Sequence, residues 1–242
     1  MKNNSYLRSI AKMIDHSLLH PAFTDAEIIS GCNTAVEYEV ASVCVKPYSI
    51  ESAKKIVDGT SVAVCAVIGF PHGNSTTEIK VAETLDAIKR GATEIDMVVN
   101  VGKVLSGEWE FAQLEILYCN MACEKNGALL KVIFETDYLK DDHIVKLCGI
   151  CSLVKPAFVK TSTGYGFVKK ENGDYNYRGA TEYNVKLMRA HCDPNIRIKA
   201  AGGIRTYDDL LKFKQLGVSR IGATATKCIL EEAEKRTKDI EK

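Results

Sequence analysis

Two lysines stand in otherwise apolar segments of this sequence, where an ammonium group is costly to bury. Lys160 lies in the segment 157–164, and Lys199 lies in the segment 197–203. If these segments form neighbouring strands, about 4.8 Å apart, both like charge and burial lower the pKa of a lysine. Lowering one pKa from about 10.4 to about 7 takes roughly 4.6 kcal/mol and yields a nucleophilic amine at neutral pH. Alternatively, both lysines simply pair with carboxylates at the strand ends, and these segments alone leave the choice open.

A carboxylate interrupts a third segment that is suited to burial. Asp96 lies between Ile95 and Met97, within residues 94–99. A carboxylate in such surroundings needs a partner. It can move protons at a reacting group, or it can be the counter-ion that fixes the lysines. The two roles are compatible, so Asp96 is the expected third member of a catalytic set.

Glycine-containing turns follow two of the apolar segments. Gly202 and Gly203 come after the segment that holds Lys199, and residues 222–226, with Thr224, follow the last apolar segment. Glycine often only permits a tight turn. Backbone N–H groups at such turns can also hold a phosphate, and in an α/β barrel this is the usual phosphate position. Together the two motifs favour a phosphorylated ligand.

These residues meet only in a fold that gathers the ends of several strands. Eight short runs rich in apolar and β-branched residues are candidate strands: 13–15, 42–45, 62–68, 94–99, 130–136, 158–161, 197–200 and 220–223. Segments with apolar residues at helical spacing lie between them: 24–38, 49–57, 76–90, 111–125, 141–151, 182–191 and 207–216. Nearly apolar strands are typical of parallel sheets covered by helices. We therefore expect a (β/α)8 TIM barrel rather than a doubly wound sheet, as a single domain over residues 1–242.

Residues that begin and end helices support these boundaries. Thr24 and Glu27 form a capping-box pattern, and Thr206 is a candidate N-cap. Gly91 and Gly217 follow long helical segments and precede strands, as glycines at helix C-termini do.

A long polar loop separates Gly164 from Gly179. Two arms with aromatic residues flank residues 171–174, Glu-Asn-Gly-Asp, which predicts a β-hairpin over residues 165–178. Because it follows a strand, the hairpin is expected to project over the catalytic face.

The composition argues against several classes of partner. The 32 basic and 31 acidic residues nearly cancel, so a nucleic-acid-binding surface is not expected. Neither a membrane-spanning run of about 20 apolar residues nor a signal-peptide core in residues 1–12 is recognisable, so a cytoplasmic protein is expected.

The histidines and cysteines do not suggest a metal site. His16 and His20 are four residues apart, but Pro21 argues against a shared helix, and His72 is isolated. Nine cysteines make a disulfide framework improbable at this chain length. The spacing of Cys148 and Cys151 also occurs in redox and zinc sites, but buried small side chains are the favoured interpretation.

With these motifs in place, the chain resembles the deoxyribose-phosphate aldolases, a family of class I aldolases. The similarity runs from about residue 10 to about residue 228. Its motifs, in the order of the family, are residues 13–19, 41–47, 67–73, 94–100, 131–136, 158–164 and 199–205.

The resemblance implies a role for individual residues. It assigns the Schiff base to Lys160, the perturbing second lysine to Lys199 and the proton relay to Asp96. The substrate-binding positions that follow from it are Asp15, Ser17, Cys44, Thr161, Gly164, Gly202, Gly203 and Thr224. Ser17 replaces the threonine of many members, Thr224 is followed by Ala225 instead of a second serine, and the 165–178 segment is longer than usual.

The implied reaction is the reversible cleavage of 2-deoxy-D-ribose 5-phosphate into D-glyceraldehyde 3-phosphate and acetaldehyde, with no metal or organic cofactor. Two alternatives remain open. One is an aldolase of the same mechanism for another phosphorylated sugar, and the other is a barrel that binds a phosphorylated metabolite without catalysis. Members of the family often pair, so the resemblance allows a homodimer.

Overall fold

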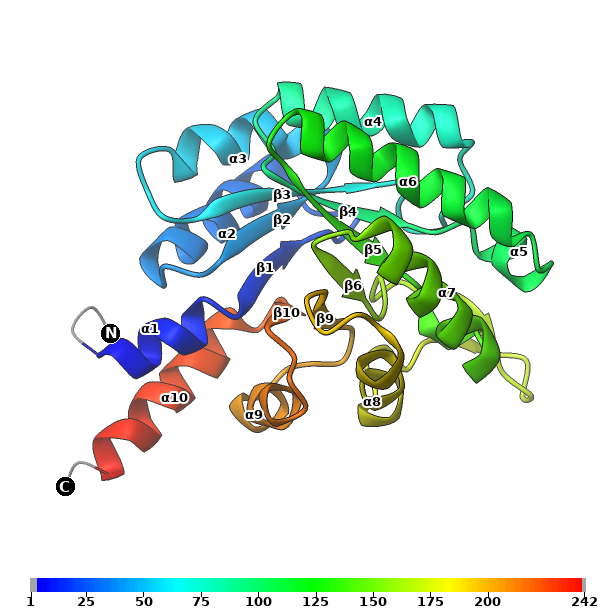
Figure 1. Cartoon of the computed structure of the whole chain (residues 1–242). Coiled ribbons are helices and arrows are strands. Elements are labelled where there is room, and N and C mark those ends of the chain that lie inside the picture. Colours follow the sequence, from blue (N-terminus) through cyan, green and yellow to red (C-terminus); the bar gives the residue numbers. More distant parts are fainter. Residues whose placement is uncertain (1–3, 241–242) are drawn as a thin grey trace.

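Eight parallel strands close into a barrel within residues 4–240, the part of the chain that the computed structural model describes (Figure 1). Around the barrel the order is β1, β10, β9, β6, β5, β4, β3 and β2. Their bounds are Ile14–Leu18 (β1), Ser42–Val45 (β2), Ala63–Ile68 (β3), Glu94–Val98 (β4), Leu129–Ile133 (β5), Phe158–Lys160 (β6), Arg197–Ala201 (β9) and Arg220–Ala223 (β10). The predicted (β/α)8 barrel is confirmed.

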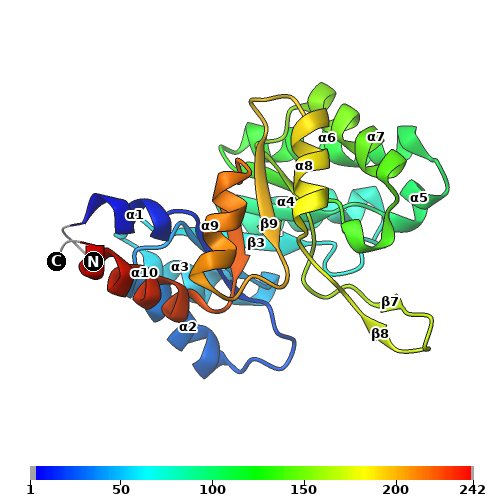
Figure 2. The ribbon, with the colours of Figure 1, turned by 90° about the horizontal axis from the view of Figure 1, so that it is seen from below.

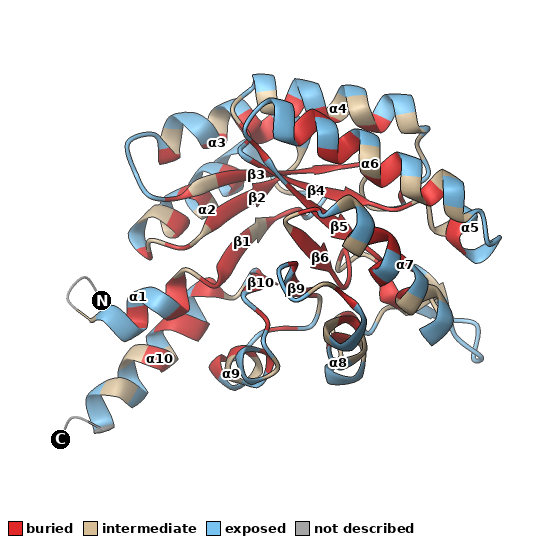
Figure 3. Cartoon of the chain, in the orientation of Figure 1, coloured by how far each residue is buried: buried red, intermediate tan, exposed pale blue. Residues whose placement is uncertain are grey.

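Helices cover the outside of the barrel (Figures 1 and 2). The α-helices are Ser5–Ala11 (α1), Asp25–Glu37 (α2), Ile50–Val57 (α3), Thr77–Lys89 (α4), Val101–Leu105 (α5), Trp109–Lys125 (α6), Asp141–Val154 (α7), Glu182–His191 (α8), Tyr207–Gln215 (α9) and Thr226–Ile240 (α10). Two 3-10 turns are Pro47–Ser49 (η1) and Thr136–Tyr138 (η2). Within the described residues, none of the helices is long and apolar enough to cross a membrane. Figure 3 shows the strands buried and the outer helix faces exposed, so the core lies between the two layers.

The predicted helix ends are present in the structure. Thr24 and Glu27 form the reciprocal capping box of α2, and the side chain of Thr206 accepts from the backbone of Asp209 in α9. Gly91 and Gly217 follow α4 and α9 with φ of 112° and 80°. These positive φ angles favour glycine and turn the chain into the next strand.

Several elements differ from the sequence prediction. Helix α10 was not predicted because its sequence is dominated by charged residues, and α5 is too short to show a helical period. Strand β5 ends at Ile133 rather than at Thr136, because Glu135 adopts a left-handed conformation with φ of 57° and leads into η2. Strand β1 continues to Leu18, which places Ser17 in the strand.

The predicted hairpin is confirmed, with shorter strands than the segment 165–178. Strands Val168–Lys169 (β7) and Tyr175–Asn176 (β8) pair antiparallel after β6. Figure 2 shows this hairpin projecting away from the barrel. The aromatic rings of Phe167 and Tyr175 stack on each other with centroids 4.0 Å apart.

Candidate active site

Lys160 and Lys199 lie side by side inside the barrel. They occupy register positions opposite each other on the neighbouring strands β6 and β9. Their Nζ atoms are 2.7 and 2.8 Å from the same oxygen, Oδ2 of Asp96 on β4. Lys160 is 2% exposed, and Lys199 is fully buried. The structure therefore brings the three predicted catalytic side chains into direct contact.

A third lysine, which the sequence analysis did not select, completes the set. Lys131 on β5 is fully buried and lies 2.8 Å from the other oxygen of Asp96 and 2.7 Å from Glu94. Its neighbour in register is Asp96. The signal was available in the sequence, because Lys131 interrupts an apolar strand in the same way as Lys160.

Asp15 links these groups to an arginine below them. Its carboxylate is 2.5 Å from Lys199, 2.5 Å from Arg220 and 2.6 Å from the hydroxyl of Ser42. Arg220 also contacts Glu94 at 3.0 Å. We call the buried groups joined by these ion pairs the interior ion cluster: Asp15, Glu94, Asp96, Lys131, Lys160, Lys199 and Arg220.

Opposite charges decide the protonation of most of this cluster. Burial alone would raise the pKa of Asp96, but Lys131, Lys160 and Lys199 outweigh it and hold that pKa well below its usual range. Burial alone would lower the pKa of Lys199, but Asp15 and Asp96 raise it instead. The net effect favours the charged form of Lys199, and its predicted role as a second, perturbing lysine stays a prediction.

An open cavity of about 220 Å³ lies at the carboxyl ends of the strands, where the active sites of such barrels are found. Of the predicted site residues it is lined by Ser17, Lys160, Gly164, Gly202, Gly203 and Thr224. Gly222 also lines it, and a Cβ at this position would lie 3.0 Å from Ala201 Cβ. Further lining side chains that were not predicted are His20, Thr163, Tyr165, Tyr177 and Arg205.

The other predicted site residues lie outside the lining of this cavity. Asp15, Asp96 and Lys199 are buried beneath Lys160 within the interior ion cluster. Thr161 is also buried, and its hydroxyl bridges to the backbone of Ala201 on the neighbouring strand. Cys44 is buried on β2, against Asp96.

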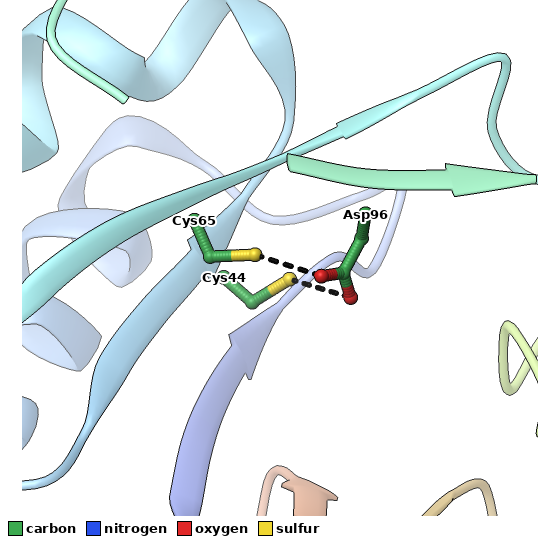
Figure 4. Close-up of side chains that lie close together, drawn as sticks. All are labelled: Cys44, Cys65 and Asp96. Carbon is green, nitrogen blue, oxygen red and sulfur yellow. Dashed lines mark hydrogen bonds between the residues drawn. The ribbon is translucent and has the colours of Figure 1, made fainter. Parts of the chain in front are cut away.

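The thiols of Cys44 and Cys65 point toward Asp96 (Figure 4). Their sulfurs are 4.0 and 3.1 Å from its carboxylate oxygens, close enough together for a metal ion to bridge the three groups. However, the ammonium of Lys131 lies 3.0 Å from Cys65 Sγ and 2.8 Å from Asp96 Oδ1. The protein's own cation thus neutralises the position that a metal would take.

The remaining histidine and cysteine motifs lie away from the cavity or form ordinary contacts. His16 is hydrogen-bonded through Nδ1 to Thr226 at 2.8 Å, and burial lowers its pKa to about 4. Cys148 and Cys151 are free, buried thiols in α7, and burial holds the pKa of Cys151 well above its usual value. These properties fit the small apolar role predicted for the pair.

A buried carboxyl group supports the loop after Lys160. Glu135 accepts hydrogen bonds from the backbone N–H of Thr163, at 3.2 Å, and from its hydroxyl. Burial, opposed by these bonds, raises the pKa of Glu135 to about 7. The left-handed turn at Glu135 is what aims this carboxyl at the loop, and neither feature was apparent in the sequence.

Comparison with known proteins places this geometry in a family. A model of the DeoC/LacD family of aldolases matches residues 9–227. A deoxyribose-phosphate aldolase of Rhodopirellula baltica is 46% identical over 227 residues, which are 94% of this chain and 90% of that protein.

Solved structures agree with this assignment. A putative deoxyribose-phosphate aldolase of Coccidioides immitis is 38% identical, with a TM-score of 0.86, over 94% of this chain and 87% of that one. The deoxyribose-phosphate aldolase of Aeropyrum pernix, described as a unique tetramer, is 26% identical with a TM-score of 0.83 over 94% and 92%. The prediction of a class I aldolase, an aldehyde-lyase, is confirmed, and the chain belongs to the DeoC/LacD aldolase family.

Proposed function

We propose that this aldolase reversibly cleaves 2-deoxy-D-ribose 5-phosphate into D-glyceraldehyde 3-phosphate and acetaldehyde, with Lys160 as the Schiff-base residue. One observation carries the choice of lysine. Among the described residues, three lysines contact Asp96. Of these three, only Lys160 lines the open cavity. Lys131 and Lys199 are fully buried behind it, where no aldehyde can reach them.

The charges of the interior ion cluster support the choice of Lys160. The cluster holds four basic side chains and three carboxylates. A net charge in a buried cluster is costly. Without Lys160, the other three basic side chains already match the three carboxylates. Lys160 is therefore the basic group in excess, at the position that meets the substrate.

The reaction steps follow from this arrangement. In the synthetic direction the Lys160 amine attacks the carbonyl carbon of acetaldehyde, and loss of water gives an iminium. The positive iminium acidifies the neighbouring methyl group, so a proton leaves and an enamine forms. The enamine carbon then attacks the aldehyde of glyceraldehyde 3-phosphate, and water releases the product from Lys160. Asp96 Oδ2 contacts both lysine nitrogens and lies where these protons move.

The phosphate of the substrate is assigned to the turns that line the cavity after the strands. Gly164, Gly202, Gly203 and Thr224 belong to its lining. Gly202 and Gly203 have φ of 87° and 81°, so the turn depends on glycine. Arg205 supplies a cation beside them.

Trapping with borohydride tests the proposed chemistry. Incubation with acetaldehyde and borohydride should add about 28 Da to Lys160, because reduction of the imine leaves an ethyl group. Lys160→Ala should abolish turnover, and Lys199→Leu should nearly abolish it. An adduct on another lysine, read by peptide mass spectrometry, would refute the assignment.

Two other properties stay predictions that direct measurements can test. The long hairpin motivates the alternative that another phosphorylated sugar is the natural substrate, and cleavage rates on a panel of sugar phosphates would decide between the two. A homodimer in the cytoplasm, built from single-domain chains, is the proposed state. Light scattering would reveal a tetramer instead, and cell fractionation would test the location.

A further inference from the structure

The hairpin that follows β6 is fixed to the barrel at both of its arms. The backbone N–H of Phe167 on the first arm donates to the hydroxyl of Tyr138 at 2.7 Å. On the second arm, the N–H groups of Arg178 and Gly179 donate to one oxygen of Asp137 at 3.0 and 2.8 Å. Both acceptors belong to η2, at the end of β5. The hairpin base is therefore a fixed wall rather than a free loop.

The second arm also packs directly on the predicted phosphate turn. Ala180 donates its N–H to the carbonyl of Gly202 at 3.1 Å. A Cβ added to Gly179 would lie only 2.6 Å from the carbonyl carbon of Gly202. The backbones of the hairpin arm and of the phosphate turn thus touch, and only a glycine fits at 179.

Tyr177 is the hairpin side chain that reaches the active-site cavity. It is half-buried, and its Cε2 lies 3.6 Å from the position that a Cβ of Gly202 would take. It shares the cavity lining with Lys160, Gly164 and Gly203. Its ring therefore lies beside the turn to which the phosphate is assigned.

The same side chain lines a second hollow behind it. An open groove of about 510 Å³ runs between the hairpin and Asp137, and Tyr177 borders both this groove and the cavity. Among the described residues, Tyr177 is the lining residue that the two hollows share. Among the described residues, its hydroxyl makes no hydrogen bond, whereas its backbone N–H is bonded to Asn176. A phenol at a cavity wall without a protein partner is available to a ligand.

We propose that Tyr177 is a specificity-determining residue: its hydroxyl donates a hydrogen bond to the phosphate of the substrate, and its ring closes that end of the cavity. This role rests on the proposed function, because it needs a phosphorylated sugar attached at Lys160. It concerns the selection of the substrate and not the chemistry of the imine. A hydrogen bond to a charged group is strong enough to control selection between a sugar phosphate and the free sugar.

The test compares 2-deoxyribose 5-phosphate with unphosphorylated 2-deoxyribose. Tyr177→Phe should lower kcat/KM for the phosphate about tenfold or more, and it should leave the free sugar within about twofold. The inhibition constant of inorganic phosphate should rise by a similar factor. Tyr177→Ala, which also opens the wall, should lower the preference for the phosphate at least as far.

Tyr175→Ala is the matched control on the same arm. Tyr175 is exposed, stacks on Phe167 and lies outside the cavity lining. Its removal weakens the hairpin without touching the phosphate end, so the preference for the phosphate should stay at the wild-type value. A loss in Tyr175→Ala equal to that in Tyr177→Phe would show that only hairpin stability matters, and would overturn the proposal.

Acetaldehyde trapping separates this proposal from the proposed function. Acetaldehyde carries no phosphate, so Tyr177→Phe should form the reduced adduct on Lys160 as fast as the wild type. If the wild type forms no adduct, the proposed function fails. If trapping is normal in all variants but both Tyr177 variants keep the wild-type preference, the role of Tyr177 is refuted.

Discussion

Replacing Lys131 by methionine tests the charge balance of the interior ion cluster. Lys131 does not reach the cavity, so the substitution alters no contact with substrate. It removes one basic group from a set of four that faces three carboxylates. After the change, three basic groups, Lys160 included, match the three carboxylates. We expect activity at neutral pH to fall.

The size of the effect follows from the contacts with Asp96. The Nζ atoms of Lys131 and Lys160 bind opposite oxygens of this carboxylate, at 2.8 and 2.7 Å. That geometry sets them about 6 Å apart, and at an effective dielectric constant of about 20 one charge contributes about 3 kcal/mol at that distance. This corresponds to about two pH units. The acidic limb of the kcat/KM profile should therefore move up by roughly that amount.

Lys80→Met provides a control with a similar structural cost. Lys80 is also fully buried, and it pairs with Glu115 at 2.6 Å on the outer side of the barrel. Breaking a buried pair costs about 3–5 kcal/mol, so both variants should lose stability in urea titrations. Only Lys131→Met should shift the pH profile. Glu94→Gln removes a carboxylate from the cluster and should move the same limb to lower pH.

The directions in which the acidic limb of the kcat/KM profile moves test whether the charge of the cluster controls the reactivity of Lys160. Equal profiles for Lys131→Met and the wild type, measured on folded protein, would show that the cluster does not set the state of Lys160. Shifts of the same sign in Lys131→Met and Glu94→Gln would also refute the reasoning, because the two variants change the charge in opposite directions.

Two further predictions concern the loop and the hairpin. Burial raises the pKa of Glu135 from 4.5 to about 7. Its contribution of about 3 kcal/mol to the free energy of unfolding is therefore fully present below pH 4.5 and is lost as the pH rises through 7. Glu135→Gln should flatten the fall in Tm between pH 5 and 8, and an unchanged slope would exclude this group as the cause. Gly179→Ala should destabilise the protein by about 1–3 kcal/mol more than Gly173→Ala and raise KM for the sugar phosphate. Both glycines have positive φ, but a Cβ at 173 meets nothing within 4 Å, so equal losses of stability in thermal melts would contradict a clash with Gly202.

The fold and the central lysines could be predicted because their signals are local. Alternating strand and helix patterns identify the barrel, and a lysine such as Lys160 stands out in an apolar strand. Barrel connectivity then makes β6 and β9 neighbours, which puts Lys199 beside it. The hairpin was also predictable, since its turn residues and aromatic arms are contiguous in the sequence.

The features that could not be predicted from the sequence depend on contacts between segments far apart in the chain. Arg220 begins a strand and resembles an ordinary exposed strand end, yet it contacts Asp15 on the neighbouring strand β1 and Glu94 across the barrel. The role of Glu135 depends on a left-handed turn that no glycine marks. Tyr177 is one of several aromatic residues in a polar loop, and only the packing on Gly202 distinguishes it.

The comparison of Lys80 with Lys160 shows why burial alone does not identify a reactive lysine. Both are buried, and both lie within 2.7 Å of a carboxylate oxygen. Lys80 faces one carboxylate, that of Glu115, so one basic group is matched by one acidic group. Lys160 shares Asp96 with two other lysines, so the carboxylates of the cluster are already matched without it. The choice of Lys160 as the proposed nucleophile therefore rests on two features together: an excess of buried basic groups over buried carboxylates, and a position that opens to a cavity.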